Sequence, residues 1–478
     1  MRIIIVGAGM VGTQLARHLI QEKHDVSLIE SNEDRARYAS NRLDCMVLHD
    51  EGNSLHVLED AGIAKADALV CVTDSDEVNM IICGLAASRY PELLKIARVR
   101  NDDYARLLPP GKTAPERPRV LGIDHFVHPD VEASRSILNA IEHGAMGDIL
   151  AFANTSYELG SINVVPGSSF DGLSLKDFHT LVKGESLVTL VERKGESILP
   201  SGATLLAPGD RVHILTNEDE MAHVFKLAGR SEQPLRKIGI VGGGRVGALI
   251  AEGLLDRGGE GNPKKGRPFV SFFKSLIPKR VRRIVIIEQD YDLCKELSAR
   301  FPEALILNED ISDESFVAEE RIDDLDLIIT ATSNQELNMI AAIYLKSRGV
   351  RRAIAMVIGA GYAAIARQLG VDVAIPMKSV VVDSILSHLM GGGVKGVHRI
   401  GDGSIDILEI DVRPDSPAVD TALPEFSLPE GGLVMLVNRG EISFIPRGDY
   451  IFKGGDRIVL ITKNGHEMEI ERFFGTSL

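Results

Sequence analysis

Two short glycine-rich stretches have the composition and spacing of a phosphate-binding turn. The first, IVGAGMVG, starts at Ile5, and the second, IVGGGRVG, starts at Ile240. In such a turn the first glycine allows a tight bend, the second lets the backbone approach a pyrophosphate, and the third lets a helix pack closely on a strand. The helix N-terminus then offers free N–H groups and a partial positive charge to the anion. The residues predicted to form these two nucleotide-binding turns are Gly7, Ala8, Gly9, Met10, Val11 and Gly12, and Gly242, Gly243, Gly244, Arg245, Val246 and Gly247.

An acidic residue ends the next β-branched segment after each turn. Glu30 ends DVSLIE, near the spacing of about 20 residues that is typical of a ribose-binding carboxylate. Such a carboxylate accepts hydrogen bonds from the ribose hydroxyls and would repel a 2′-phosphate, so Glu30 favours NAD(H) over NADP(H). Glu288 ends RIVIIE in the same way, although it lies further from its turn. A solvated charge at a strand end is the simpler alternative for Glu30.

Further polar residues follow the remaining apolar segments, where parallel strands would end at one edge of a sheet. Ligands bind beyond that edge in doubly wound sheets. Thr73 or Asp74 could instead cap the next helix, a role that is compatible with ligand contact. The second half has Met356 where the first has Arg98, which indicates a weaker or different second site. The residues predicted to contact ligand at this edge are Asp50, Thr73, Asp74 and Arg98 in the first half, and Asp310, Thr332 and Ser333 in the second.

Residues that could carry out catalysis beside a nicotinamide are sparse. An NAD-dependent enzyme must place an acid or base next to the cofactor. His125 and His128, in HFVH, are the most suggestive pair, but the matching VAIP stretch of the second half has no histidine. No cysteine or carboxylate cluster joins them into a metal site. We expect no catalytic residue and no metal, so the nucleotide is sensed rather than reacted with. An NAD-dependent oxidoreductase with duplicated nucleotide domains stays the alternative.

The two turns belong to two copies of one larger pattern. Each copy alternates β-branched segments with helical periodicity, and after the first turn Val11, Leu15 and Leu19 recur every four residues. This alternation predicts a parallel sheet covered by helices on both faces. Each copy continues into strands separated by Pro/Gly turns and ends in Gly-Asp-Arg plus an apolar strand. The predicted fold class is α/β, with two tandem Rossmann-type doubly wound parallel sheets, each followed by a small α+β domain. The predicted domains are 1–125, 145–229, 235–375 and 395–478.

Composition excludes several classes of protein. The chain has 478 residues and a formal net charge of -15, which argues against a nucleic-acid-binding surface because phosphates need Lys and Arg. The cysteines are dispersed, without a CxxC pair, and we expect reduced thiols at Cys45, Cys71, Cys83 and Cys294. The longest apolar run, residues 353–366, is shorter than the roughly 20 residues of a membrane-spanning helix.

The duplicated order of a glycine-turn domain and a small Gly-Asp-Arg domain resembles the RCK family over essentially the whole chain. The arrangement is similar to NAD-binding regulatory subunits of potassium-uptake systems. The resemblance implies NAD+ or NADH as ligand, with ATP or ADP as alternatives. It also implies a homotetramer ring, peripheral on the cytoplasmic face of the bacterial inner membrane, that gates a separate potassium-translocating membrane subunit. In family terms, Gly7–Val11, Glu30, Thr73, Asp74 and Arg98 form the first site, and Gly242–Val246 and Glu288 form the second. A gating ring for a potassium channel or antiporter is a further alternative.

One departure from this pattern is an insertion at residues 258–280, between the first helix and second strand of the second half. It is rich in Lys and Arg, and its phenylalanines recur at helical spacing. An amphipathic helix that contacts anionic lipid or the membrane subunit is one interpretation. A loop whose aromatic face packs on its own domain is the other.

Overall fold

The computed structural model describes most of the chain and places it in two compact units. The described residues are 1–105, 120–142, 149–152, 155–182, 184–228, 235–255, 283–389, 394–400, 405–425, 428, 432–440, 442–463, 466, 470, 473 and 474. One unit comprises Met1–Ile20, His24–Met146 and Pro234–Ile385, and the other comprises Gln21–Lys23, Gly147–Gln233 and Leu386–Leu478. The insertion predicted at 258–280 lies outside the described residues. The predicted domain boundaries stay predictions.

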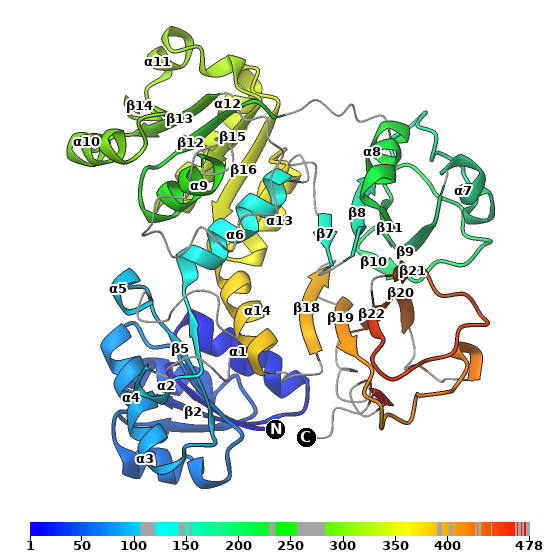
Figure 1. The fold of residues 1–478 in the computed structure, drawn as a ribbon. Helices are drawn as coiled ribbons and strands as arrows, with labels where there is room; N and C mark the ends of the chain where they lie inside the picture. The colour runs from blue at the N-terminus through cyan, green and yellow to red at the C-terminus, as the bar shows by residue number, and fades with distance from the viewer. Residues whose placement is uncertain are drawn as a thin grey trace. The chain divides into compact units, whose positions relative to one another are not determined.

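The first half begins with a six-stranded parallel sheet in the order β3-β2-β1-β4-β5-β6. Strands β2 and β5 of this sheet are labelled in the blue part of Figure 1. Its central strand β4 reads as a continuous apolar segment and is buried along its whole length, because both faces of the sheet are covered. The strands are β1 (Arg2–Val6), β2 (Asp25–Glu30), β3 (Met46–His49), β4 (Ala68–Cys71), β5 (Leu94–Arg98) and β6 (His125–Val127). The helices are α1 (Met10–Gln21), α2 (Glu33–Ser40), α3 (Leu55–Asp60), α4 (Asp76–Arg89), α5 (Asp102–Ala105) and α6 (Pro129–Glu142), with 3-10 turns η1 (Ile63–Lys65) and η3 (Val120–Gly122).

The second half repeats this topology, with the strand order β14-β13-β12-β15-β16-β17. The strands are β12 (Lys237–Val241), β13 (Arg283–Glu288), β14 (Leu305–Asn308), β15 (Leu327–Thr330), β16 (Arg352–Val357) and β17 (Val373–Pro376). The helices are α9 (Arg245–Leu255), α10 (Tyr291–Arg300), α11 (Glu314–Glu319), α12 (Gln335–Arg348), α13 (Ala360–Gln368) and α14 (Met377–Leu389), with the 3-10 turn η5 (Ile322–Asp324). Both sheets are of the predicted doubly wound kind.

Helix α6 follows the first sheet in the sequence but packs on the second. Ile137, Leu138 and Ile141 belong to one hydrophobic core with α9 and the strands of the second sheet. Gly253 of α9 allows the close approach, since a Cβ there would lie 2.6 Å from Leu138 Cδ1. A converse contact joins α14 of the second half to α1 of the first, where Gln14 Nε2 donates a hydrogen bond to Ser379 Oγ at 3.4 Å. Each nucleotide domain is therefore joined to a helix that starts in the other.

The second unit holds two five-stranded sheets that run β10-β9-β11-β8-β7 and β18-β19-β22-β20-β21. Strands of both sheets contribute to one apolar core that contains Leu159, Leu215, Ile407 and Val459. The first sheet has β7 (Ile149–Ala151), β8 (Tyr157–Asn163), β9 (Ser186–Arg193), β10 (Glu196–Ile198) and β11 (Arg211–Asn217), with α7 (Leu175–Leu181) and α8 (Glu218–Leu227). The second has β18 (Val394–Ile400), β19 (Ile405–Asp411), β20 (Leu433–Arg439), β21 (Ile442–Phe444) and β22 (Arg457–Lys463), with the 3-10 turn η6 (Leu423–Glu425).

The repeated Gly-Asp-Arg segment has a structural role. Asp210 receives hydrogen bonds from Arg193 Nε at 2.7 Å and from Nη2 at 2.6 Å, and Ala207 N donates to the same carboxylate at 2.8 Å. Asp456 and Arg439 repeat this two-pronged pair in the second sheet. The preceding glycine has φ +91° in both copies, so a side chain there would strain the turn. The segment fixes the turn that enters the last strand of each small sheet.

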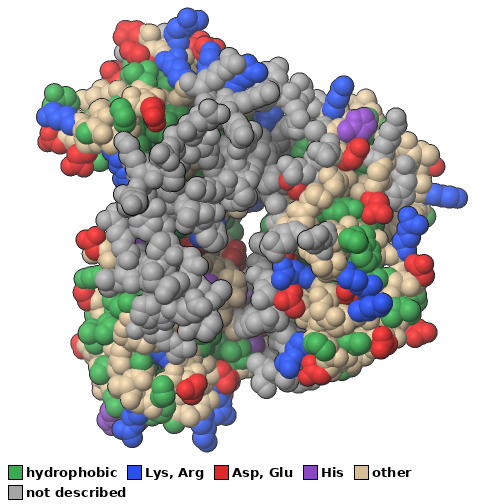
Figure 2. All heavy atoms as spheres, in the orientation of Figure 1, with side chains coloured by type: hydrophobic (Ala, Val, Ile, Leu, Met, Phe, Trp, Pro, Cys, Tyr) green, Lys and Arg blue, Asp and Glu red, His purple; other side chains and the backbone are tan. Residues whose placement is uncertain are grey.

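No helix within the described ranges is long and apolar enough to cross a membrane. On the face drawn in Figure 2, the coloured acidic and basic side chains are interspersed. All four cysteines are free thiols in the structure.

We predict that Asp210→Asn destabilises the protein more than removal of an exposed pair does. The side chain of Asp210 is 2% exposed, and Arg193 holds the pKa of its carboxyl below the usual range against the opposing effect of burial. The midpoint of thermal unfolding should fall by roughly 3–6 °C near neutral pH. Asp25→Asn, in the exposed pair with Arg2, should change it by about 1 °C or less.

The pH dependence provides the check. A carboxyl group with a lowered folded-state pKa stabilises the protein above its unfolded-state pKa of about 3.9, and this contribution is lost as the pH falls through the folded-state value. The difference between wild type and Asp210→Asn should therefore shrink in acid. A difference that stays constant from pH 7 to pH 3 would contradict this account.

Candidate nucleotide-binding sites

The first glycine turn has the backbone geometry that a pyrophosphate requires. Gly7 has φ +107° and lies against the Thr73 backbone, where a Cβ would be 3.0 Å from Thr73 N. A Cβ on Gly12 would be 1.9 Å from the Gly7 carbonyl oxygen, so only glycine lets α1 start this close to β1. A Cβ on Gly9, in contrast, would have no neighbour within 4 Å. The middle glycine thus faces open space, as a phosphate-binding turn needs.

The second turn has nearly the same backbone angle and close distances. Gly242 has φ +96°, a Cβ on Gly247 would lie 2.0 Å from the Gly242 carbonyl oxygen, and a Cβ on Gly244 would have no neighbour within 4 Å. Both turns lead into the N-terminus of a helix, which is α1 in the first half and α9 in the second. Both sets of residues therefore fit the phosphates of a nucleotide.

Glu30 and Glu288 hold the two turns in place. One Glu30 oxygen accepts from Ala8 N at 2.6 Å, and the other accepts from Asn32 N at 2.9 Å. Glu288 accepts from Gly243 N at 2.7 Å and Asp290 N at 2.9 Å. Glu30 is buried, so it is not the solvated strand-end charge of the simpler alternative. Each carboxylate oxygen has a second acceptor position, and ribose binding by Glu30 and Glu288 stays a prediction.

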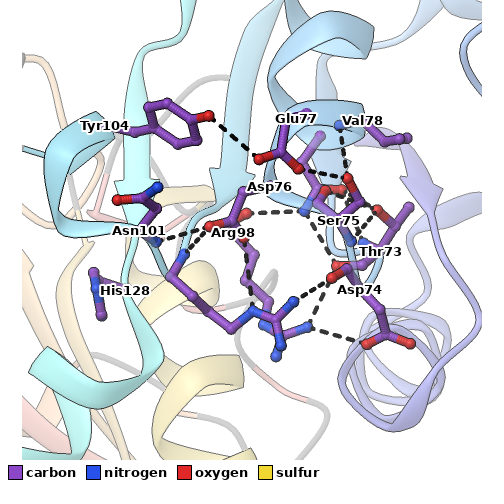
Figure 3. A network of polar contacts seen from close by, with 12 residues as sticks. Thr73, Asp74, Ser75, Asp76, Glu77, Val78, Arg98, Asn101, Tyr104 and His128 are labelled. Atoms are coloured by element: carbon purple, nitrogen blue, oxygen red, sulfur yellow. Dashed lines mark hydrogen bonds and ion pairs between the residues drawn. The ribbon is translucent and has the colours of Figure 1, made fainter. Parts of the chain in front are cut away.

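A network of arginines and carboxylates lies at the carboxyl edge of the first sheet (Figure 3). Arg98 donates from Nη1 to the Thr73 carbonyl at 3.4 Å and lies 3.6 Å from Asp74. Asp76 accepts from the backbone N–H groups of Arg100 and Asn101 at 2.8 Å and 2.7 Å. Burial, followed by the nearby Arg100, lowers the pKa of the Arg98 guanidinium. The buried Arg98 Nε has no hydrogen-bond partner within the described structure, so this cation has capacity for a ligand.

The cap of α4 is Ser75, so the alternative that Thr73 or Asp74 caps this helix is wrong. Ser75 Oγ accepts from Val78 N at 3.2 Å. Thr73 instead bonds Asn79 through both its backbone N–H and its hydroxyl, at 2.9 Å and 2.7 Å. The chain needs one more residue to turn from the strand edge into the helix. Thr73 and Asp74 are consequently left in the loop beside the glycine turn.

The second sheet keeps the frame of this edge but loses its two arginines and the charge of Asp74. Thr332 bonds Asn338 at 2.9 Å and 2.7 Å, as Thr73 bonds Asn79. At the end of β16, Met356 and Ile358 stand where the first half has Arg98 and Arg100. Ser333 stands in the loop position of Asp74. The two sites thus share a backbone and differ in the chemistry of the sheet edge.

Asp50 and Asp310 follow the edge strands β3 and β14. Both side chains are exposed and accept from nearby backbone N–H groups, those of Glu51 at 2.7 Å and Ser312 at 2.9 Å. Asp50 N also donates to the Glu30 carbonyl at 3.1 Å. Ligand contact by these two carboxylates stays a prediction.

The structure adds residues that the sequence reasoning did not select. Arg100, Asp76 and Asn79 belong to the first-site network, and Arg35 lies 3.4 Å from Asp74. Asn79 had a detectable signal, because it is shared by the two matching segments SDEVNMI and NQELNMI. Arg100, Asp76 and Arg35 had no such signal, because the matching positions of the second half carry other residue types.

His125 and His128 do not come together as a metal site. No group of three or more potential ligands able to hold a metal is present among the described residues. His128 is buried, and its Nε2 lies 2.9 Å from Arg245 Nη2 in the second glycine turn. The adjacent Asp130 lies 3.7 Å from Arg245 Nε. His128 therefore takes part in a contact between the two nucleotide domains.

Fold and site together define a protein of two tandem Rossmann nucleotide-binding domains, each followed by a small β-rich domain. The TrkA-N domain family matches residues 3–129 and 271–376, and the TrkA-C domain family matches residues 159–229 and 407–475. The chain belongs to the family of proteins that carry these two domains in tandem.

The similarity to known proteins covers the whole chain. The Trk system potassium uptake protein TrkA of Halomonas elongata is 28% identical over 100% of this chain and 99% of its own length. The Trk system potassium uptake protein TrkA homolog of Archaeoglobus fulgidus is 29% identical over 99% of this chain and 100% of its own. Among solved structures, the GsuK RCK domain aligns with 100% of this chain and 95% of that chain, at a TM-score of 0.55 and 18% identity. This likeness shows a common fold.

We predict that Arg98→Met, which installs the residue that the second half has, lowers the affinity for NADH about tenfold or more. A hydrogen bond to a charged group contributes roughly 1.5–3 kcal/mol. Isothermal titration calorimetry on the full-length protein measures the effect. Arg89→Met is the matched control, because Arg89 pairs with Glu59 at the far end of α4. Equal affinities for Arg98→Met and Arg89→Met would remove Arg98 from the site.

Proposed function

We propose that the chain is a nucleotide-sensing regulatory subunit of a potassium-uptake system. It binds NAD+ or NADH, and nucleotide occupancy controls potassium transport by a separate membrane subunit. The observation that carries the proposal is the pair of glycine turns whose middle glycines, Gly9 and Gly244, face open space in otherwise close-packed loops. The curated relatives named above, which are potassium uptake proteins, support the assignment of the transported ion.

The choice of nucleotide rests on the first site. A buried carboxylate at Glu30, close to the expected ribose position, disfavours a 2′-phosphate and so favours NAD(H) over NADP(H). A protein of the same fold, the GsuK channel, has been solved bound to NAD. ATP and ADP share the adenosine and phosphate groups that the glycine turn, Glu30 and Arg98 would contact. They are therefore the competing ligands to test.

Sensing is favoured over catalysis by the chemistry of the sheet edge. The charged side chains of the described network are arginines, which stay charged, and carboxylates that already bond backbone or arginine groups. Binding without reaction fits a regulatory protein. An oxidoreductase, in contrast, would change the NADH absorbance with some substrate.

We propose further that copies of the chain assemble into a ring, a homotetramer, at the cytoplasmic face of the inner membrane. A stripe of apolar side chains on α12, on α13 and at the two ends of α13, each 37–64% exposed, supports this assembly. Its members are Ile340, Ile358, Tyr362, Ile365 and Leu369. On α13 they recur at the spacing of one helical face. An apolar face on two helices suits contact with a second copy, because a closed ring buries the same surface in every subunit.

We predict that Ile365→Glu lowers the oligomeric state, as measured by sedimentation velocity. A buried charge in an apolar contact is unfavourable, and in a cyclic assembly the same unfavourable contact recurs at every subunit interface. Leu205→Glu is the matched control. Leu205 is also apolar and is 60% exposed, but it lies between β10 and β11 of the second unit. The proposed face is wrong if both variants sediment like wild type.

We predict that Gly9→Val strongly reduces nucleotide control of potassium uptake while the protein still folds. The valine side chain would occupy the space left for a pyrophosphate, and its Cβ meets no protein atom. The test compares NADH-dependent and ADP-dependent potassium uptake in cells or vesicles that contain the membrane subunit. Normal nucleotide response in Gly9→Val, or consumption of NADH by the purified wild-type protein with a substrate panel, would contradict the regulatory proposal.

A further inference from the structure

Arg245 stands inside the second glycine turn, yet its described contacts are with the first half of the chain. Its Nη2 is 2.9 Å from His128 Nε2, and its Nε is 3.7 Å from Asp130 Oδ2. His128 is 5% exposed, and its Nδ1 receives the Val131 N–H at 3.4 Å. These two partners stand at the start of α6, which packs on α9. We call Arg245, His128 and Asp130 the second-turn clasp.

The first glycine turn has no such clasp among its described contacts. Met10 occupies the position of Arg245 and is 62% exposed. The segment that corresponds to His128–Asp130 is Pro376–Lys378, which cannot form the same ion pair. A side-chain contact between Gln14 and Ser379, at 3.4 Å, lies one turn further along the helices. The clasp is therefore specific to the second turn.

The position of Arg245 matters because it is the first residue of α9. Phosphate groups bind at such a helix start, and an arginine there makes strong charge-assisted hydrogen bonds to them. Asp130 presents a carboxylate to the same guanidinium, so it competes with a phosphate for Arg245 and repels the phosphate as a like charge. The second sheet edge, with Met356 and Ile358, supplies no other cation at the positions of Arg98 and Arg100.

We propose that Asp130 and His128 restrain the second nucleotide site by holding Arg245, which a nucleotide phosphate must recruit in order to bind. The inference rests on the proposed function, because it assigns a regulator to one of the two proposed sites. Arg245 is the phosphate-binding residue of that site, and Asp130 and His128 are positioning residues that act through it. Nucleotide binding at the second turn then releases the start of α6 from the arginine.

The test uses the full-length chain with Gly9→Val, so that binding is measured at the second turn alone. The probes are ADP and NADH in separate calorimetric titrations. Asp130→Asn should raise the affinity about threefold to tenfold, because it removes the competing charge. Arg245→Met should lower the affinity at least fivefold. In the presence of Arg245→Met, Asp130→Asn should have no further effect, since the two changes act on one contact.

Two matched controls separate the clasp from general changes in charge. Glu132→Gln removes a carboxylate from the same first turn of α6, but Glu132 pairs with Arg135 at 3.0 Å and should leave the affinity unchanged. In a Gly244→Val background, where only the first turn is open, Asp130→Asn should also leave NADH affinity unchanged. If Asp130→Asn loses the wild-type circular dichroism, Asp130→Ser carries the same expectation.

Distinct outcomes identify which statement has failed. The clasp is overturned if Asp130→Asn binds the probes no more tightly than its parent, or if its gain persists with Arg245→Met. It is also overturned if Gly9→Val binds neither probe while wild type does, because the second turn is then not a nucleotide site. The proposed function itself fails if wild type binds neither NADH nor ADP.

Discussion

Each glycine turn depends on a carboxylate at the end of the neighbouring strand, which accepts one hydrogen bond from the turn and one from the residue before the next helix. Glu30 bonds Ala8 N and Asn32 N, and Glu288 bonds Gly243 N and Asp290 N. Each carboxylate thereby ties the glycine turn to the start of the next helix. Hydrogen bonds to a charged acceptor contribute roughly 1.5–3 kcal/mol each, more than neutral ones. The turn is in this way fixed before any ligand arrives, which lowers the ordering cost of binding.

With this frame in common, the two halves differ chiefly in where their cations stand. The first half has Arg98 and Arg100 at the sheet edge and Met10 in the turn. The second has Met356 and Ile358 at the edge and Arg245 in the turn. The prediction of a weaker or different second site came from the loss of Arg98 alone. The structure shows that a cation is still present at the second turn, but that it is held by residues of the first half.

Much of the fold could be predicted from the sequence because its signals are local. Glycine spacing, β-branched segments and helical periodicity each act within a few residues, and they identified both parallel sheets and both turns. The alternative of a cap at Thr73 or Asp74 was wrong by one or two residues, because the cap position depends on backbone angles that the sequence pattern does not fix to a single residue. The packing of α6 on the second sheet was not predicted at all. Its evidence is contact between residues such as Leu138 and Gly253, which are far apart in the sequence.

That exchange of helices has a consequence for how a ligand acts. A nucleotide that contacted only its own domain would stabilise that domain and nothing else. Helix α6, however, begins directly after β6, whose Val127 is paired with Arg98, and it ends in the core of the second domain with Ile137 and Ile141. A close-packed core transmits displacement because it has little free volume to absorb it. A ligand that alters the start of α6 therefore acts on a helix that both nucleotide domains share, which is the physical requirement for one chain to give a single response to two sites.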